Sequence, residues 1–142
     1  MPDESTTPDL VEITRRMFEA AGRRDADALL SFFAPDAVWD LSSAGIGRFE
    51  GAAAIRGFLE DWFAAYDDYT TEPDEILDLG NGVVSAVTRQ SARLSGSADG
   101  TQVREVWAYV FVWVDGLVRQ LASYQDANKA HAAAERLAEE RG

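Results

Sequence analysis

The 142-residue chain carries a formal net charge of -12 and contains no cysteine. This acidity makes nucleic acid and anionic membranes poor partners, because their phosphates would be repelled, and the lack of cysteine excludes disulfides and thiolate metal sites. The length is that of one domain with its own core, and the sequence has no apolar run of about 18 residues that would predict a transmembrane helix.

The N-terminus, MPDESTTPD, is acidic and polar, unlike a secretory signal or a transit peptide. The lack of cysteine fits a reducing cytoplasm, and a cytoplasmic location is expected. Residues 1–7 are expected to be disordered, and a single domain is expected over residues 8–140.

Apolar residues at helical spacing predict three helices before the main strands. The first is expected over 8–22, with Thr7 as N-cap before Pro8. The second is expected over 26–33, after Asp25 as its N-cap. The third is expected over 52–66.

Between the second and third helices, Pro35 is expected to end the second helix, and residues 37–41 read as a short strand. The glycine-rich stretch 42–51 is expected to be a loop. It is not a dinucleotide-binding motif, because position 50 is glutamate and no strand–helix–strand unit follows.

Two hairpins are predicted next. Asn81-Gly82 joins strands expected at 70–79 and 83–94, and Pro73 indicates an edge strand or a bulge. Asp115-Gly116 joins strands expected at 102–114 and 117–125.

The strand at 102–114 is apolar on both sides, which is typical of a central strand covered on both faces. Helices would cover one face, and a second subunit or another layer would cover the other. Glu105 is the exception, since this carboxylate lies in line with aromatic side chains.

The last segment, 127–140, is expected to be a helix with Asp126 as N-cap. His131, the only histidine, is expected on its surface. The sequence therefore offers no histidine and carboxylate metal motif and no serine–histidine–aspartate system. Helices segregated from an antiparallel sheet make an α+β fold, with a cone-shaped cavity between the twisted sheet and three helices.

Several stretches resemble the nuclear transport factor 2-like (cystatin-like) superfamily, and most closely its SnoaL-like polyketide cyclase branch. The resemblance spans about 9–136 and is carried by six segments: Arg24–Asp27, Phe33–Asp40, Glu50–Gly51, Ile55–Phe58, Trp113–Val118 and Ser123–Asp126. It implies a curved, mostly antiparallel sheet wrapped against three N-terminal helices, plus a C-terminal helix. The superfamily includes cofactor-free cyclases, ketosteroid isomerases, epoxide hydrolases, dehydratases and binding proteins without activity.

The resemblance to ketosteroid isomerases implies roles for two residues. Asp40, in Val38-Trp39-Asp40, stands at the place of their general base, and Tyr109 stands near their second oxyanion donor. The tyrosine that these enzymes carry on the first helix is missing here.

The resemblance to limonene-type epoxide hydrolases argues against that activity. Arg89 is retained, but Ser91 and Ser123 replace the two aspartates, and serine cannot take a proton from water. Asp40 and Glu105 are then the candidates for a carboxylate inside the cavity.

Aromatic walls would desolvate such a carboxylate and raise its pKa, which suits a general base near neutrality. The predicted catalytic residues are Asp40, Tyr109 and Glu105. The predicted substrate-binding residues are Trp62, Tyr66, Arg89, Ser91, Trp107 and Ser123. Two alternatives stay open: Glu105 forms an ion pair with Arg89, and Asp40 accepts hydrogen bonds from nearby backbone amides.

Three functions follow from these residues. The first is a cofactor-free and metal-free acid/base enzyme, a cyclase or isomerase, acting on an apolar small molecule such as a polyketide, steroid-like or terpenoid compound. The second is a binding protein for such a ligand without turnover. The third is an interaction module that forms a homodimer through the outer face of the sheet, which can coexist with either of the others.

Overall fold

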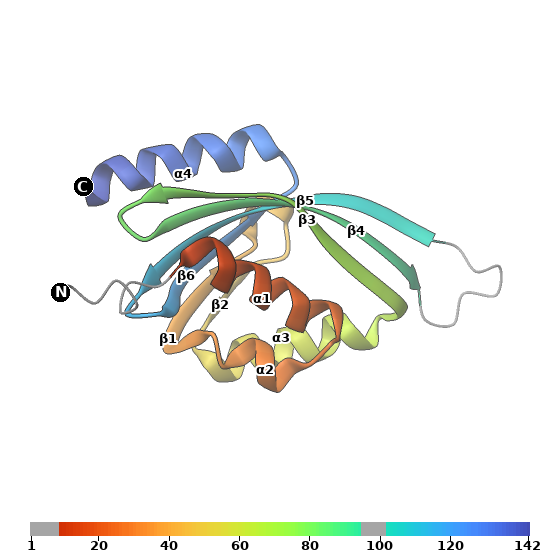
Figure 1. Ribbon diagram of the computed structural model, residues 1–142. Coiled ribbons are helices and arrows are strands. Elements are labelled where there is room, and N and C mark those ends of the chain that lie inside the picture. The colour runs from red at the N-terminus through yellow and green to blue at the C-terminus, as the bar shows by residue number, and fades with distance from the viewer. Residues whose placement is uncertain (1–8, 95–101) are drawn as a thin grey trace.

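The computed structural model describes residues 9–94 and 102–142 (Figure 1). In that part of the chain the helices are α1 (Leu10–Gly22), α2 (Ala26–Leu30), α3 (Ala52–Ala64) and α4 (Ala127–Arg141). The strands are β1 (Phe33–Asp40), β2 (Arg48–Glu50), β3 (Tyr66–Gly80), β4 (Val83–Leu94), β5 (Gln102–Val114) and β6 (Leu117–Tyr124), and a short 3-10 helix, η2 (Ser42–Ala44), lies between β1 and β2.

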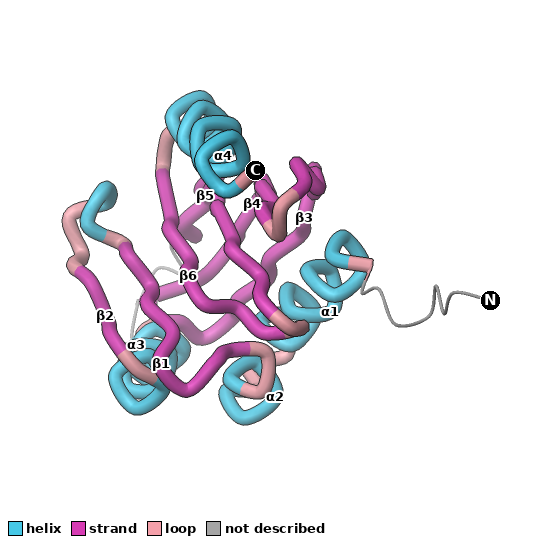
Figure 2. The backbone as a smooth tube through the Cα atoms, turned by 90° about the vertical axis from the view of Figure 1, so that its left-hand side faces the viewer, coloured by secondary structure: helices cyan, strands magenta, loops and turns pink. Residues whose placement is uncertain are grey.

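The strands form one sheet in the order β2-β1-β6-β5-β4-β3. β1 and β6 are parallel, and every other neighbouring pair is antiparallel. The sheet curves around α1, α2 and α3, while α4 lies on its other face (Figures 1 and 2). The predicted α+β cone with three N-terminal helices and a C-terminal helix is confirmed.

The first two helices are shorter than predicted. α1 begins at Leu10 with Asp9 as its N-cap, whose side chain accepts from the Glu12 amide at 3.1 Å. Thr7 and Pro8, like the predicted disorder at 1–7, lie outside the described residues. α2 follows the predicted cap, Asp25, but ends at Leu30 because β1 begins at Phe33.

The connection between α2 and α3 holds more strand than predicted. Pro35 lies inside β1, where the register with β6 is irregular between Phe33 and Val38, so that its missing N–H interrupts no regular ladder. The predicted loop at 42–51 contains η2 and β2, which pairs with the end of β1. A three-residue strand is too short to give a period-2 signal in sequence.

Both predicted hairpins are present. Asn81 and Gly82 have φ of 58° and 82°, and Asp115 and Gly116 have φ of 53° and 81°, as a type I′ turn requires. The strands at 83–94 and 102–114 have the predicted bounds. β3 begins at Tyr66 rather than at residue 70, and it is an edge strand with a register shift after Pro73, as predicted.

The predicted burial of β5 on both faces is explained by α4. Asp126 caps this helix by accepting from the amides of Asn128 and Lys129. Its alanines at helical spacing pack against Ala108 and Val110 on the outer face of β5. Val106 is left 50% exposed beyond the end of α4. Homodimerisation through this face stays a prediction.

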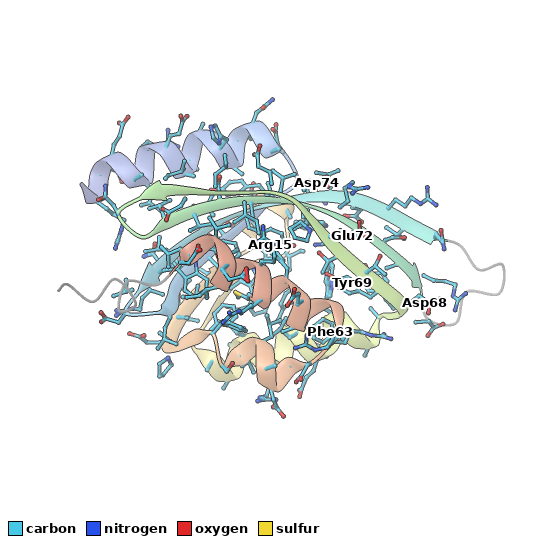
Figure 3. All side chains as sticks on the ribbon, in the orientation of Figure 1. Arg15, Phe63, Asp68, Tyr69, Glu72 and Asp74 are labelled. Carbon is cyan, nitrogen blue, oxygen red and sulfur yellow. The ribbon has the colours of Figure 1, made fainter. Side chains whose placement is uncertain are left out.

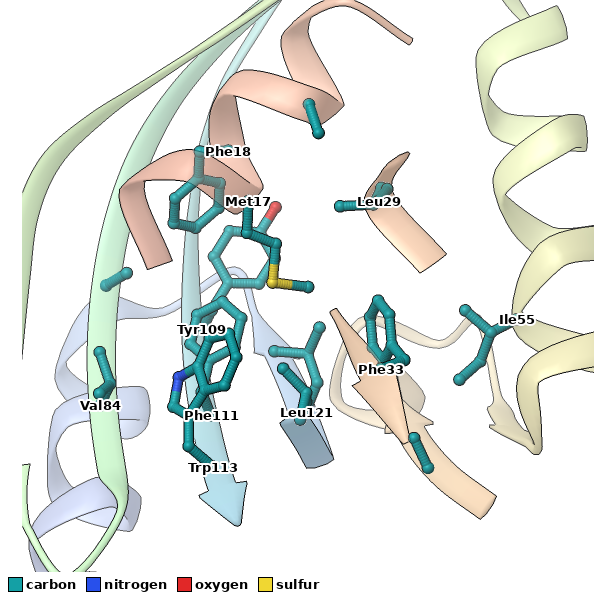
Figure 4. Packing of buried hydrophobic residues seen from close by; sticks show 14 of the residues in the cluster. Met17, Phe18, Leu29, Phe33, Ile55, Val84, Tyr109, Phe111, Trp113 and Leu121 are labelled. Atoms are coloured by element: carbon teal, nitrogen blue, oxygen red, sulfur yellow. The ribbon is translucent and has the colours of Figure 1, made fainter. Parts of the chain in front are cut away.

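The main core lies on the inner face, between the sheet and α1 to α3. Figure 4 shows Met17 and Phe18 of α1 facing Tyr109 and Phe111 of β5. The Phe18 ring lies 5.4 Å from the Tyr109 ring and 5.9 Å from the Phe111 ring, measured between centroids. This core surrounds the cavity described next.

Candidate functional site

An apolar cavity lies between the inner face of the sheet and the N-terminal helices. Its helix wall consists of Met17, Phe18, Ala21, Leu29, Phe58, Leu59, Trp62 and Phe63. Its sheet wall consists of Phe33, Trp39, Leu41, Tyr69, Thr71, Gln90, Trp107, Tyr109, Phe111, Leu121 and Ser123. Pockets that are mostly apolar with a few convergent polar groups are typical small-molecule sites.

The free space in this cavity is about 60 Å³. An apolar cavity of about 150 Å³ is enough to hold benzene. A ring-sized ligand therefore enters only when lining side chains turn aside. Phe58, Trp62 and Phe63 of α3 are among the lining side chains that are partly exposed, and they are candidates for this movement.

Tyr109 is the main polar group inside the cavity. Its hydroxyl accepts a hydrogen bond from Gln90 Nε2 at 2.6 Å, and Gln90 also donates to Thr88 Oγ1 at 3.3 Å. Burial, together with the nearby Tyr69, raises the pKa of Tyr109, against the opposing effect of the Gln90 hydrogen bond. A phenol held neutral in an apolar site can donate a hydrogen bond to a developing oxyanion.

A second polar pair lies across β6 and β1. Ser123 is opposite Tyr109 in the sheet register, and its hydroxyl accepts from Trp39 Nε1 at 2.8 Å. Both residues line the cavity. Four of the predicted site residues therefore line this one cavity: Trp62, Trp107, Tyr109 and Ser123.

Glu105 lies at the outer end of the cavity rather than inside it. It lines a smaller pocket, which shares Trp62, Tyr69, Gln90 and Trp107 with the main cavity. Glu105 Oε2 accepts a hydrogen bond from Trp107 Nε1 at 2.9 Å. Tyr66 also lines this outer pocket. Glu105 therefore projects from the same face of β5 as Trp107 and Tyr109, but it lies outside the main cavity in which the sequence placed it.

Asp40 does not face the cavity, and the prediction that it points inward is wrong. Its neighbour Trp39 lines the cavity, and successive side chains on a strand point to opposite faces. Asp40 Oδ1 accepts from the Ser42 hydroxyl at 2.6 Å and from the Ser42 amide at 2.9 Å. These bonds hold the pKa of Asp40 below its ordinary value. The alternative role at the start of a loop is confirmed.

Arg89 and Ser91 also lie on the outer face, because Gln90 between them points inward. Arg89 Nε contacts Asp74 Oδ1 at 2.8 Å, and its Nη2 contacts Glu72 at 3.4 Å. The predicted ion pair between Glu105 and Arg89 is therefore wrong, and the placement of Arg89 and Ser91 in the cavity is wrong as well.

Sequence reasoning missed Gln90, Tyr69 and Trp39 as site residues. Gln90 lies between the predicted residues Arg89 and Ser91, and Trp39 precedes the predicted Asp40. For these two, the prediction was wrong by one position along the strand. Tyr69 approaches Phe63 where β3 passes α3, with ring centroids 6.2 Å apart (Figure 3). Tyr69 was missed because the strand is expected from residue 70, whereas β3 begins at Tyr66.

Tyr69 and Tyr109 are expected to ionise later in the folded protein than in the unfolded chain. Burial raises the pKa of Tyr69 to about 12 and that of Tyr109 in the same direction. Tyrosine ordinarily has a pKa of about 10. From about pH 10 upward the unfolded chain therefore binds fewer protons than the folded chain, and the free energy of unfolding falls as the pH rises.

Titration of phenolate absorbance checks this expectation. The native protein should ionise late compared with the protein unfolded in urea, and Tyr109→Phe should remove part of the delayed signal. Identical native and unfolded curves would contradict the burial of these phenols.

Among residues 9–94 and 102–142, no three histidine, cysteine, aspartate or glutamate side chains cluster as a metal site. Of the helices in the described ranges, none is long and apolar enough to cross a membrane. The exposed His131 lies 3.7 Å from Glu135, one turn along α4.

Solved structures share this fold at low sequence identity. A putative polyketide cyclase from Xanthomonas campestris pv. campestris is 24% identical, with a TM-score of 0.67 over 85% of this chain and 93% of that one. A putative SnoaL-like polyketide cyclase from Jannaschia Sp. CCS1 is 15% identical, with a TM-score of 0.73 over 95% of this chain and 97% of that one.

A third solved structure contains a bound amine. It is a hypothetical protein with a ketosteroid isomerase-like fold from Catenulispora acidiphila DSM 44928, in complex with trimethylamine. It is 16% identical, with a TM-score of 0.70 over 91% of this chain and 94% of that one. At these identities the likeness concerns the fold.

No curated protein is a significant match to the sequence. A family model, the SnoaL-like domain, matches residues 14–121. That range runs from α1 into β6 and includes most of the cavity lining. The chain belongs to the SnoaL-like domain family.

Proposed function

We propose that the protein holds an apolar small molecule in the cone cavity and acts on it by acid/base chemistry, as a cofactor-independent cyclase or isomerase. One observation carries the proposal: aromatic walls enclose a hydrogen-bonded Tyr109, and the carboxylate of Glu105 lies at the outer end of the same space. The two structural relatives described as putative polyketide cyclases support this reaction type.

The chemistry needs two groups only. Glu105 would take a proton next to a carbonyl group of the ligand, and Tyr109 would donate a hydrogen bond to the oxygen that becomes negative. Ring closure or double-bond migration can follow from that enolate. Both residues project from the inner face of β5.

Binding without turnover is the second candidate function. Four side chains line both the inner cavity and the outer pocket that holds Glu105: Trp62, Tyr69, Gln90 and Trp107. Trp107 Nε1 already donates a hydrogen bond to one carboxylate oxygen of Glu105. A ligand confined to the inner cavity would then meet hydrogen-bonding groups but no base.

A thermal-shift screen followed by turnover assays separates the two functions. The ligands are apolar cyclic ketones, steroids and monoterpene epoxides, and small amines are included because of the trimethylamine complex of the Catenulispora protein. Tyr109→Phe should still bind a hit but turn it over at least tenfold more slowly, because one oxyanion donor is lost. Tyr124→Phe, which removes a hydroxyl on the α4 side of the sheet, is the matched control.

Equal turnover by wild type and Tyr109→Phe would remove Tyr109 from the mechanism. Hits that bind without any turnover in wild type would favour the binding protein. The absence of any apolar hit would contradict both functions.

A further inference from the structure

Four aromatic side chains and one carboxylate line the small outer pocket of the cavity, together with Gln90, Ala92 and Val103. The four aromatic residues and the glutamate are Trp62, Tyr66, Tyr69, Trp107 and Glu105, and we refer to them as the aromatic cage. They come from three elements, α3, β3 and β5, which the fold brings together at one end of the cone.

The rings stand as walls rather than as one stack. The Trp62 and Trp107 planes meet at 87° with centroids 6.2 Å apart, and the Trp62 and Tyr66 planes meet at 61° with centroids 5.4 Å apart. The Tyr66 and Tyr69 planes meet at 34° with centroids 6.3 Å apart. Rings that differ in orientation around a small space can present their electron-rich faces to one enclosed group.

The charge in the cage is negative and has no cationic partner in the described part of the chain. Glu105 accepts from Trp107 Nε1, and Arg89 on the neighbouring strand is engaged by Asp74 on the opposite face. The segment 95–101, which precedes β5, contains no lysine or arginine in its sequence. An anionic ligand would be repelled, whereas a cation would be attracted to both the carboxylate and the rings.

We propose that the aromatic cage binds a compact organic ammonium group, which Glu105 neutralises and the surrounding rings enclose. The free space is about 10 Å³, room for about one water molecule, so a head group larger than water enters only when walls of the cage turn aside. Tyr66 and Trp62 are partly exposed and are the walls that turn outward to admit it.

The proposal does not depend on turnover. The cage adjoins the inner cavity through Trp62, Tyr69, Gln90 and Trp107. A molecule with an apolar body and an amine head would therefore fill both spaces. If Glu105 is also the general base for an uncharged substrate, ammonium ions would inhibit that reaction competitively.

The test is titration of the protein with choline and with 3,3-dimethyl-1-butanol, the uncharged isostere in which carbon replaces the choline nitrogen. Two tryptophans of the cage make intrinsic fluorescence a direct readout, and calorimetry gives an independent affinity. Choline should bind at least tenfold more tightly than the isostere, and binding should weaken as the salt concentration rises. Glu105→Gln and Trp62→Leu should each weaken choline binding at least tenfold.

Glu19→Gln is the matched control, because it removes the same charge from the exposed face of α1. It should bind choline as wild type does. Equal affinity for choline and the isostere would overturn the proposal, as would no binding of choline at millimolar concentration or unchanged binding in Glu105→Gln. If choline binds but no apolar ligand binds in the inner cavity, the proposed enzymatic function is contradicted and the proposed ammonium site is supported.

Discussion

Replacing Glu105 by glutamine is expected to slow turnover of an uncharged ligand by about 10²–10⁴-fold, the usual contribution of a positioned general base. Glutamine has the same size, and its amide oxygen can still accept the hydrogen bond that Trp107 Nε1 donates to Glu105. The fold and the affinity for an uncharged ligand should therefore stay within a few-fold of wild type. The loss would appear in kcat and not in KM.

The rate measurement uses a hit from the ligand screen, with Glu19→Gln as the charge-matched control. Asp40→Asn is a second comparison, because Asp40 faces Ser42 and not the cavity. Both controls should keep the wild-type rate. Undiminished turnover in Glu105→Gln would contradict the role of Glu105, and a large loss in Asp40→Asn would restore Asp40 as the base.

Replacing Phe111 by alanine is expected to lower the free energy of unfolding by about 3–5 kcal/mol. Phe111 is 1% exposed and packs against Phe18 on α1 and against Tyr109 and Trp113 on its own strand. Truncation removes these contacts and enlarges a cavity that is already present. Since a domain of this size is stable by only about 5–15 kcal/mol, the loss would be a large part of the total.

Urea denaturation measures this loss as a shift of the transition midpoint with an unchanged slope. Val106→Ala on the outer face of the same strand is the control, because Val106 is 50% exposed. It should cost less than about 1 kcal/mol. Equal effects of the two substitutions would contradict the position of the main core on the inner face of β5.

Hairpins and helices with strong local signals were predictable from the sequence. The strand bounds at 83–94 and 102–114 and the caps at Asp25 and Asp126 were correct because turn and capping residues act over a few positions. β2 was missed because it contains three residues and exists only by pairing with β1.

Site residues on strands were less predictable, because an error of one position moves a side chain to the other face of the sheet. The sequence points to Asp40 where Trp39 lines the cavity, and to Arg89 and Ser91 where Gln90 does. The inner face of β5 was predicted correctly because Glu105 and the aromatic residues occupy alternate positions along the strand, and alternate side chains lie on the same face. The cage could not be predicted, since it needs α3, β3 and β5 to meet in space.

The most direct test of a ligand site in the cone uses Met17, which lines the cavity. With carbon-13 in the methionine methyl groups, a spectrum recorded during titration with a screening hit reports on this side chain. A shift of the Met17 signal that saturates with the thermal-shift affinity is the predicted result. A Met17 signal that stays unchanged at saturating ligand would contradict binding in the cavity.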